Sequence, residues 1–118
     1  MKKVLVCEDD ESIAEICELI LTKMGCNVQK CEQISNIYEI VEKVQPDLIL
    51  MDLWMPEIGG SKATELLKTS NKYKHIPIII FSANNEIEKV SINLMADGFI
   101  KKPFEVSHFE ETVHAYIK

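Results

Sequence analysis

The chain has 118 residues, of which 47% are hydrophobic and 27% are charged, a composition that fits one globular domain with no room for a second. Its net charge of −6 at pH 7 argues against direct binding to nucleic acid, which requires a basic face. No apolar run approaches the roughly 20 residues that span a bilayer, and no signal-peptide pattern opens the chain, so we expect a cytoplasmic protein without membrane insertion.

Apolar residues alternate between the short runs typical of buried strands and the spacing typical of helices packed on a sheet. In chain order, this alternation predicts a strand at residues 4–7, a helix at 13–24, a strand at 27–31, a helix at 34–44, a strand at 48–51, a helix at 63–67, a strand at 76–81, a weaker helix at 87–94, a strand at 99–100 and a helix at 106–116. Gly25 and Pro46 end the first two helices. Residues 54–60, with a Gly59–Gly60 pair, predict a loop.

Five strands that alternate with five helices predict an α/β fold with a doubly wound, five-stranded parallel sheet of the flavodoxin-like type. In such folds the ligand lies beyond the carboxyl ends of the strands, where the strand order reverses. The residues that follow each strand are therefore the first candidates for a functional site.

Charged or hydroxyl side chains follow four of the five predicted strands. Glu8 and Asp9 follow the first strand, Asp52 the third, Ser82 the fourth and Lys102 the fifth. A charge inside the sheet would be costly without a partner, so apolar runs that stop at these residues deliver them to one edge. We expect three carboxylates and one ammonium to converge there.

A cluster of three carboxylates requires cations. Two carboxylates about 4 Å apart repel by roughly 4 kcal/mol at an effective dielectric constant near 20. Magnesium takes hard oxygen ligands and is commonly completed by phosphate, while Lys102 and Ser82 add a fixed positive charge and a hydroxyl. These groups suit phosphoryl transfer, in which the protein mainly positions and neutralises oxygens. A carboxylate can itself be the nucleophile, and Asp52 is the best candidate because it ends a central strand.

Each of these residues alone has a simpler interpretation. The acidic run that continues into Asp10 and Glu11 is typical of a solvated helix start, where negative charge favours the helix dipole. A lone aspartate after a strand commonly forms a turn or a cap. The joint placement of the polar residues on one edge is what favours a functional site.

The cysteines have no spacing typical of a metal site, and a cytosolic chain keeps its thiols reduced. We expect them to act as small hydrophobic residues that are buried or half-buried. They are Cys7, Cys17, Cys26 and Cys31.

The sequence resembles the receiver domain of bacterial two-component response regulators over essentially its whole length. Four segments carry the resemblance: residues 4–11 (VLVCEDDE), 47–56 (DLILMDLWMP), 78–83 (IIIFSA) and 102–104 (KPF). Each segment alone is weak, whereas the combination is highly specific. The resemblance implies the strand order 2-1-3-4-5, which is known for receivers.

The resemblance also implies the acceptor and the metal ligands. Asp52 would accept a phosphoryl group from a phosphohistidine on a histidine kinase or a histidine phosphotransfer protein. Asp9, Asp52 and the backbone carbonyl of Trp54 would hold Mg²⁺. Glu8 would act on the metal mainly through water.

Three further residues would act on the phosphoryl group or respond to it. Lys102 would pair with Asp52 and then with the phosphoryl oxygens, through a Lys102–Pro103 peptide that is often cis in this family. Ser82 would bond another phosphoryl oxygen. Phe99 would change rotamer as Ser82 moves, giving a two-state switch biased by the new charge.

Several positions depart from the commoner family pattern without removing a required group. Ser82 stands where threonine is commoner, and Phe99 where tyrosine is frequent. Residues 94–96 read Leu-Met-Ala where the family often has Ala-Gly-Ala, so Met95 alters the surface of the fourth helix. In receivers, the residues two positions after the phosphoacceptor and two after the hydroxyl flank the path by which water attacks the aspartyl phosphate, and the resemblance places Trp54 and Asn84 there. Since Trp54 cannot orient that water and its indole can cover the phosphoryl group, we expect slow self-dephosphorylation.

Other functional classes fit less well. A haloacid-dehalogenase-type phosphohydrolase also uses an aspartyl nucleophile after a strand, but within a DxD motif, and here position 54 is Trp. A flavodoxin-like electron carrier needs a phosphate-binding loop rich in Ser, Thr and Gly after the first strand, where Glu8, Asp9 and Asp10 would repel the phosphate. A non-phosphorylated receiver-like scaffold would be expected to lack one of the acids or the lysine.

We therefore expect a switch that catalyses only its own modification, without an output domain, either stand-alone or excised from a larger regulator or hybrid kinase. It would be a monomer or weak dimer, binding an unidentified protein target through the fourth helix, fifth strand and fifth helix.

Overall fold

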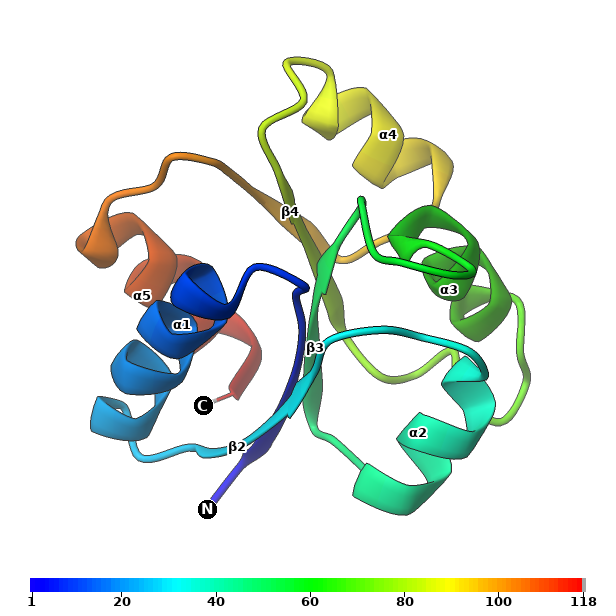
Figure 1. Ribbon diagram of the computed structural model, residues 1–118, viewed down its shortest axis with the longest axis horizontal. Coiled ribbons are helices and arrows are strands. Elements are labelled where there is room, and N and C mark those ends of the chain that lie inside the picture. The colour runs from blue at the N-terminus through cyan, green and yellow to red at the C-terminus, as the bar shows by residue number, and fades with distance from the viewer. Residues whose placement is uncertain (118) are drawn as a thin grey trace.

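The computed structural model describes residues 1–117, in which five strands alternate with five helices (Figure 1). In chain order the elements are β1 (Lys3–Cys7), α1 (Glu11–Lys23), β2 (Asn27–Cys31), α2 (Ile37–Val44), β3 (Leu48–Asp52), α3 (Gly60–Lys68), β4 (Ile78–Ser82), α4 (Ile87–Asn93), β5 (Gly98–Lys101) and α5 (Val106–Ile117). Neighbouring strands pair in parallel in the order β2-β1-β3-β4-β5. The predicted fold class and the strand order implied by the resemblance are confirmed.

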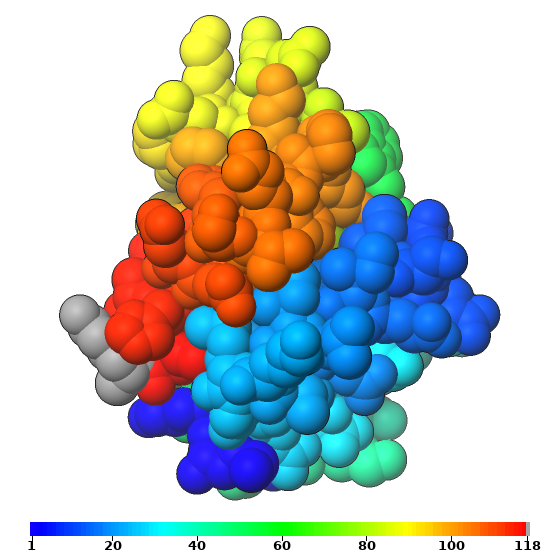
Figure 2. Space-filling view, turned by 90° about the vertical axis from the view of Figure 1, so that its left-hand side faces the viewer, coloured from blue at the N-terminus to red at the C-terminus, as the bar shows by residue number. Residues whose placement is uncertain are grey.

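The helices cover both faces of the sheet. Helices α1 and α5 lie on one face and α2, α3 and α4 on the other (Figure 1). Figure 2 shows α1 and α5 side by side on their face. Alternate residues of each inner strand enter the two cores: Val4 and Val6 of β1 pack with α1 and α5, whereas Leu5 and Cys7 pack with α2 and α3. Because both sides of β1, β3 and β4 are buried, these strands read as continuous apolar runs.

Helix α2 begins at Ile37 and not at residue 34, where the apolar spacing predicted its start. The side chain of Asn36 caps the helix by accepting hydrogen bonds from the backbone N–H groups of Tyr38 at 3.1 Å and Glu39 at 3.3 Å. Ile34 is fully buried and forms an isolated parallel bridge with Glu57. Ile34 is therefore buried at a position that continues the apolar spacing of α2, but its backbone belongs to the loop before the helix.

Other element boundaries differ from the predictions for local reasons. Strand β4 begins at Ile78 rather than at residue 76, since the intervening Pro77 has no N–H to donate to a ladder. Helix α3 extends beyond residues 63–67 at both ends, where polar residues carry no apolar signal. Within residues 1–117, none of the helices combines the length and apolar character that crossing a membrane requires.

A buried ammonium joins α3 to the amino ends of β4 and β5. Lys68 Nζ lies 2.6 Å from Asp97 Oδ2 and donates to the carbonyls of Lys74 at 3.1 Å and Ile76 at 2.9 Å. Asp97 Oδ2 also accepts the backbone N–H of Ile78 at 2.8 Å. These acceptors match the three donors of an ammonium group and offset the cost of burying it.

The cysteines are free thiols, as predicted. Cys7, Cys17 and Cys26 are buried, and Cys31 is half-buried. Cys7 and Cys31 contact the core on the α2 and α3 side of the sheet, whereas Cys17 and Cys26 belong to the core on the opposite side.

Candidate functional site

The carboxyl ends of β1 and β3 bring three carboxylates together. Glu8 and Asp9 directly follow β1, and Asp52 is the last residue of the central strand β3. One oxygen from each carboxylate lies within 4.8 Å of those of the other two. Glu8 is 2% exposed and Asp52 is 3% exposed, whereas Asp9 is exposed. The cluster is therefore accessible to solvent from the side of Asp9.

Lys102 brings an ammonium group to these carboxylates from the segment after β5. Its Nζ lies 2.6 Å from Glu8 Oε1 and 3.6 Å from Asp52 Oδ1. The resemblance implied that Lys102 pairs with Asp52, but the shorter contact is with Glu8. Both carboxylates are almost fully buried, with Glu8 2% and Asp52 3% exposed, so each favours a paired cation and Lys102 lies between them.

The neighbouring strand ends fix the position of Lys102. Its backbone N–H donates to the carbonyl oxygen of Ser82 at 2.9 Å, which continues the pairing of β5 with β4. Its Nζ lies 4.7 Å from the ring centroid of Phe81, within cation–π distance. The Lys102–Pro103 peptide is cis, as the resemblance implies.

The environment of Glu8 favours its protonated form. Burial raises the pKa of Glu8 from its ordinary value of 4.5 to about 7, and the Asp52 carboxylate acts in the same direction. The ammonium of Lys102 and the backbone N–H of Asp10, which donates to Glu8 Oε2 at 3.1 Å, oppose this rise. Glu8 thus carries a proton more readily than an exposed glutamate does.

Asp10 serves a structural purpose, in agreement with its interpretation as a helix start. Its Oδ1 accepts the backbone N–H of Ile13 at 3.2 Å and caps α1. The adjacent Asp9 carries the carboxylate that joins Glu8 and Asp52. The acidic run therefore divides into a cluster at the strand end and a cap at the helix start.

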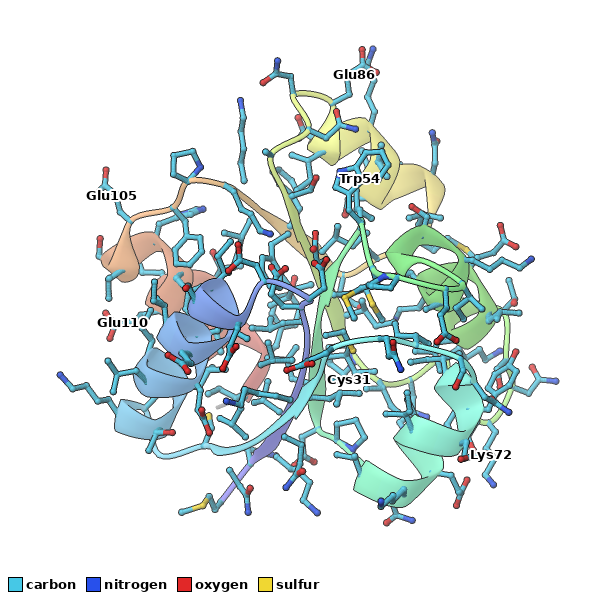
Figure 3. All side chains as sticks on the ribbon, in the orientation of Figure 1. Cys31, Trp54, Lys72, Glu86, Glu105 and Glu110 are labelled. Carbon is cyan, nitrogen blue, oxygen red and sulfur yellow. The ribbon has the colours of Figure 1, made fainter. Side chains whose placement is uncertain are left out.

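The loop after β3 packs tightly around Asp52. The backbone N–H of Trp54 donates to Asp52 Oδ1 at 3.3 Å. The indole of Trp54 is 72% exposed and projects outward from this loop (Figure 3). A Cβ added at Gly60 would lie 1.9 Å from the carbonyl oxygen of Asp52, so this position admits only glycine. Gly60 was missed as a site residue, although the Gly59–Gly60 pair was its signal in the sequence.

The remaining predicted residues lie on β4 and β5 and in the loop after β4. Ser82 ends β4, is buried, and accepts the backbone N–H of Asn84 at 3.1 Å through its Oγ. Asn84 is half-buried and accepts the N–H of Glu86 at 2.8 Å. Phe99 is half-buried in β5 and packs on the core beneath α4. Within residues 1–117, Ser82 has no hydrogen bond to the acidic cluster, so the geometry places this hydroxyl at the right edge without joining it to Asp52.

The donor set of the cluster fits Mg²⁺. The three side chains that face one another are all carboxylates, which are the hard oxygen ligands that Mg²⁺ prefers. Two of them are buried beside an exposed third, so a metal would be reached from solvent and would keep several of its waters. The nearby ammonium of Lys102 would attract an anionic group that completes the site.

Comparison with known proteins places the chain in a protein family. Residues 4–114 match the model of the response regulator receiver domain. The polar-differentiation response regulator DivK of Brucella anthropi is 28% identical over 119 residues, which cover 98% of this chain and 96% of that protein. The CAI-1 autoinducer sensor kinase/phosphatase CqsS of Vibrio cholerae is 30% identical over 98% of this chain, which spans only 17% of that kinase.

A solved structure supports the fold. The receiver domain of the sensor histidine kinase PA1611 from Pseudomonas aeruginosa PAO1 superposes with a TM-score of 0.87 at 22% identity. The match covers 98% of this chain and 97% of that one. That domain was crystallised with a magnesium ion coordinated in its active site cleft.

Proposed function

Because this chain belongs to the response regulator receiver domain family, we propose that it is a signalling switch in which Asp52 accepts a phosphoryl group from a phosphohistidine of a partner protein. Receiver domains act as switches and not as classical enzymes that turn over a separate substrate. The observation that supports Asp52 best is its place at the end of the central strand, within 4.8 Å of two further carboxylates and 3.6 Å from an ammonium.

Asp9 and Asp52, with the backbone carbonyl of Trp54, would hold Mg²⁺, and Glu8 would act mainly through a bound water. The metal supplies neutralisation of the phosphoryl oxygens during transfer. Asp9 is exposed and can take a metal from solvent, whereas Glu8 is buried and hydrogen-bonded to Lys102. This difference supports a direct role for Asp9 and an indirect one for Glu8.

The transfer itself requires a carboxylate nucleophile and charge stabilisation. An Asp52 carboxylate oxygen attacks phosphorus while the phosphorus–nitrogen bond to the partner histidine breaks, and the imidazole keeps the electron pair. The backbone N–H of Trp54 donates to Asp52 Oδ1 and so helps to orient the carboxylate. Lys102, 3.6 Å from the same oxygen, stabilises the charge of the phosphoryl oxygens.

The new phosphoryl group would then change the contacts of Lys102 and Ser82. Lys102 would exchange its 2.6 Å contact with Glu8 for phosphoryl oxygens. Ser82 Oγ, which accepts the backbone N–H of Asn84, would donate to another phosphoryl oxygen, and Phe99 on the neighbouring strand β5 would change rotamer as Ser82 moves. These movements would alter the surface formed by α4, β5 and α5.

The surface beside Lys102 offers a place for the protein donor. An apolar hollow of about 490 Å³ lies between the start of α1 and the segment after β5, and its lining includes Ile13, Ile16, Val106 and Lys102. Ile16 is 48% exposed and Val106 is 52% exposed. A partner helix that carries the phosphohistidine would bury these side chains and align its imidazole with Asp52.

Docking at this hollow can be separated from chemistry. Ile16→Asp should slow phosphorylation by a histidine phosphotransfer protein while leaving phosphorylation by acetyl phosphate unchanged. Ile92→Asp, which alters an exposed isoleucine on α4, is the matched control and should leave both rates unchanged. Equal rates from the protein donor for wild type and Ile16→Asp would reject the hollow as the donor surface.

The output of the switch would be binding. We propose that residues 1–118 act as one receiver unit in the cytoplasm, as a monomer or weak dimer, and engage a protein target through α4, β5 and α5. A surface hollow of about 490 Å³ between β5 and α5, with Phe99, Lys101 and His108 in its lining, offers part of that surface.

Phosphorylation of Asp52 is tested by mass spectrometry after incubation with acetyl phosphate and Mg²⁺, and by binding of beryllofluoride. Wild type should gain one phosphoryl group that is lost in Asp52→Asn. Asp10→Asn is the matched control, because Asp10 lies at the same edge but caps α1. Modification that persists in Asp52→Asn, or that disappears in Asp10→Asn, would contradict the assignment.

A further inference from the structure

Two of the four cysteines face each other across neighbouring strands. Cys7 of β1 and Cys31 of β2 are register partners in the parallel pairing of these strands. Register partners in a parallel pair point to the same face of the sheet, and both thiols contact the core on the α2 and α3 side. Neighbouring strands lie about 4.8 Å apart, within the range of Cα separations that a disulfide spans.

The pair combines a protected thiol with an accessible one. Cys7 is buried, whereas Cys31 is half-buried and lines a surface hollow of about 200 Å³ with Leu5, Ile40 and Val44 in its lining. Figure 3 shows Cys31 on the edge strand β2. A small oxidant can therefore reach Cys31 while Cys7 remains inside the protein. Since β2 has a neighbour on one side only, it can shift toward β1 to complete a bond.

The contacts of the two thiols distinguish them in the same way. Cys31 Sγ donates a hydrogen bond to the carbonyl oxygen of Gln33 at 2.9 Å, near the surface, whereas Cys7 is enclosed in the core. Cys31 is therefore the thiol that a small oxidant meets first, and Cys7 reacts with it in the second step.

We propose that Cys7 and Cys31 form a modification site, a thiol pair that hydrogen peroxide converts into a reversible intrachain disulfide. The sulfur of Cys31 attacks one peroxide oxygen, the oxygen–oxygen bond breaks, and one water leaves, giving a sulfenic acid on Cys31. The sulfur of Cys7 then attacks the Cys31 sulfur, the sulfur–oxygen bond breaks, and the departing hydroxide takes the Cys7 proton as a second water. Peroxide is the species reduced, and the two thiols are oxidised.

The disulfide would act on the acidic cluster, and this consequence rests on the function proposed above. Cys7 directly precedes Glu8, and the backbone N–H of Glu8 donates to the carbonyl of Cys31 at 3.0 Å. When the edge strand β2 shifts toward β1 to close the bond, the carbonyl of Cys31 moves with it, so the acceptor that holds the backbone of Glu8 changes position and Glu8 and Asp9 move relative to Asp52. The oxidised protein should therefore bind Mg²⁺ less tightly than the reduced protein.

The test begins with the reduced full chain, treated with hydrogen peroxide without any phosphodonor. Free thiols are then alkylated, and peptides are mapped by mass spectrometry before and after dithiothreitol. We expect one cross-linked peptide that joins Cys7 to Cys31, with recovery of both thiols on reduction. Cys17 and Cys26 should remain alkylatable after unfolding, because they belong to the opposite core. Oxidation of Cys31 without a cross-link, or a cross-link to Cys26, would overturn the proposal.

Variants of single cysteines test the cross-link independently. Cys31→Ser should abolish the cross-link, and Cys7→Ser should leave Cys31 as a sulfenic or sulfinic acid, whereas Cys26→Ala should cross-link as wild type does. Because wild-type peptide mapping requires no variant, the result stands even where a variant folds poorly. Magnesium titration of the oxidised and reduced protein tests the coupling separately: equal affinities would refute the coupling, and loss of Mg²⁺ binding in both forms would refute the proposed function instead.

Discussion

The carbonyl oxygen of Asp52 and the α-carbon of Gly60 are so close that a Cβ on Gly60 would lie 1.9 Å from that oxygen. The first residue of α3 therefore rests against the main chain of the proposed phosphoacceptor. Because the obstacle is backbone and not a flexible side chain, it cannot move aside without moving Asp52.

Gly60→Ala should destabilise the protein by about 1–3 kcal/mol, as overpacking does, and should weaken the response to beryllofluoride. Urea denaturation and beryllofluoride titration measure the two effects. Gly25→Ala is the control: Gly25 has a positive φ of 88° but no described atom within 4 Å of an added Cβ. Its substitution should cost stability alone. A Gly60→Ala variant that retains the wild-type response would show that the contact is unimportant for the site.

Met95 lies after α4 with a φ of 62°, a left-handed conformation that costs roughly 1–2 kcal/mol for a residue with a Cβ. Met95→Gly should raise the free energy of unfolding by about 1 kcal/mol, since Met95 is 57% exposed and buries little. Met95→Ala keeps the Cβ and should not reproduce the gain. The midpoints of urea denaturation for the three proteins provide the comparison, and equal values for the glycine and alanine variants would refute the strain.

The raised pKa of Glu8 predicts a pH dependence of stability. A carboxyl whose pKa is higher in the folded state than the ordinary 4.5 stabilises the fold at low pH, and this contribution is lost as the pH rises through about 7. In EDTA, the stability advantage of wild type over Glu8→Gln should fall between about pH 4.5 and 7, by at most about 3 kcal/mol. Glu11→Gln, an exposed neighbour, should follow wild type. A constant difference between wild type and Glu8→Gln over this range would contradict the assignment.

Asp9 and Asp10 should respond differently to substitution. Asp10→Ala removes the cap of α1 and should cost about 1 kcal/mol of stability with little change in magnesium affinity. Asp9→Ala should lose magnesium affinity and keep its stability. The fluorescence of Trp54, the single tryptophan, reports magnesium titrations beside the site. Equal losses of affinity in both variants would mean that the roles of this acidic pair are misassigned.

Trp54 should slow the loss of the phosphoryl group. Trp54→Asn supplies an amide that can orient an attacking water, worth about 1 kcal/mol or a roughly fivefold faster loss. Trp54→Phe keeps an aromatic cover and should remain slow. The half-life of the phosphorylated protein under identical magnesium decides the matter. The 72% exposure of the indole shows that any cover must form after phosphorylation, so an unchanged half-life in Trp54→Asn would remove this role.

The order of the elements and the edge that carries the site could be predicted because both follow from apolar periodicity. The ends of apolar runs predicted where Glu8, Asp52 and Lys102 leave the core. The finer contacts depend on three-dimensional packing: no pattern in the sequence predicts that Lys102 Nζ lies closer to Glu8, at 2.6 Å, than to Asp52, at 3.6 Å.

Other features escaped prediction for similar reasons. Ile34 is buried at a helical spacing but lies outside α2, since the cap at Asn36 and not the pattern sets the helix start. The close approach of Gly60 to Asp52 joins two segments whose distance no local pattern encodes. The orientation of the Trp54 indole is likewise a property of the surface and not of the sequence around it.

The largely buried side chain of Lys68 restrains one end of the sheet more than the other. Its ammonium clamps the segments that enter β4 and β5, through Ile76 and Asp97, to the last turn of α3. At the other end, the side chain of Ser82 is restrained by a single hydrogen bond from the Asn84 backbone. We therefore expect a change at the acidic cluster to displace the side chain of Ser82 more readily than the segments held by Lys68, so that the amino ends of β4 and β5 keep their positions.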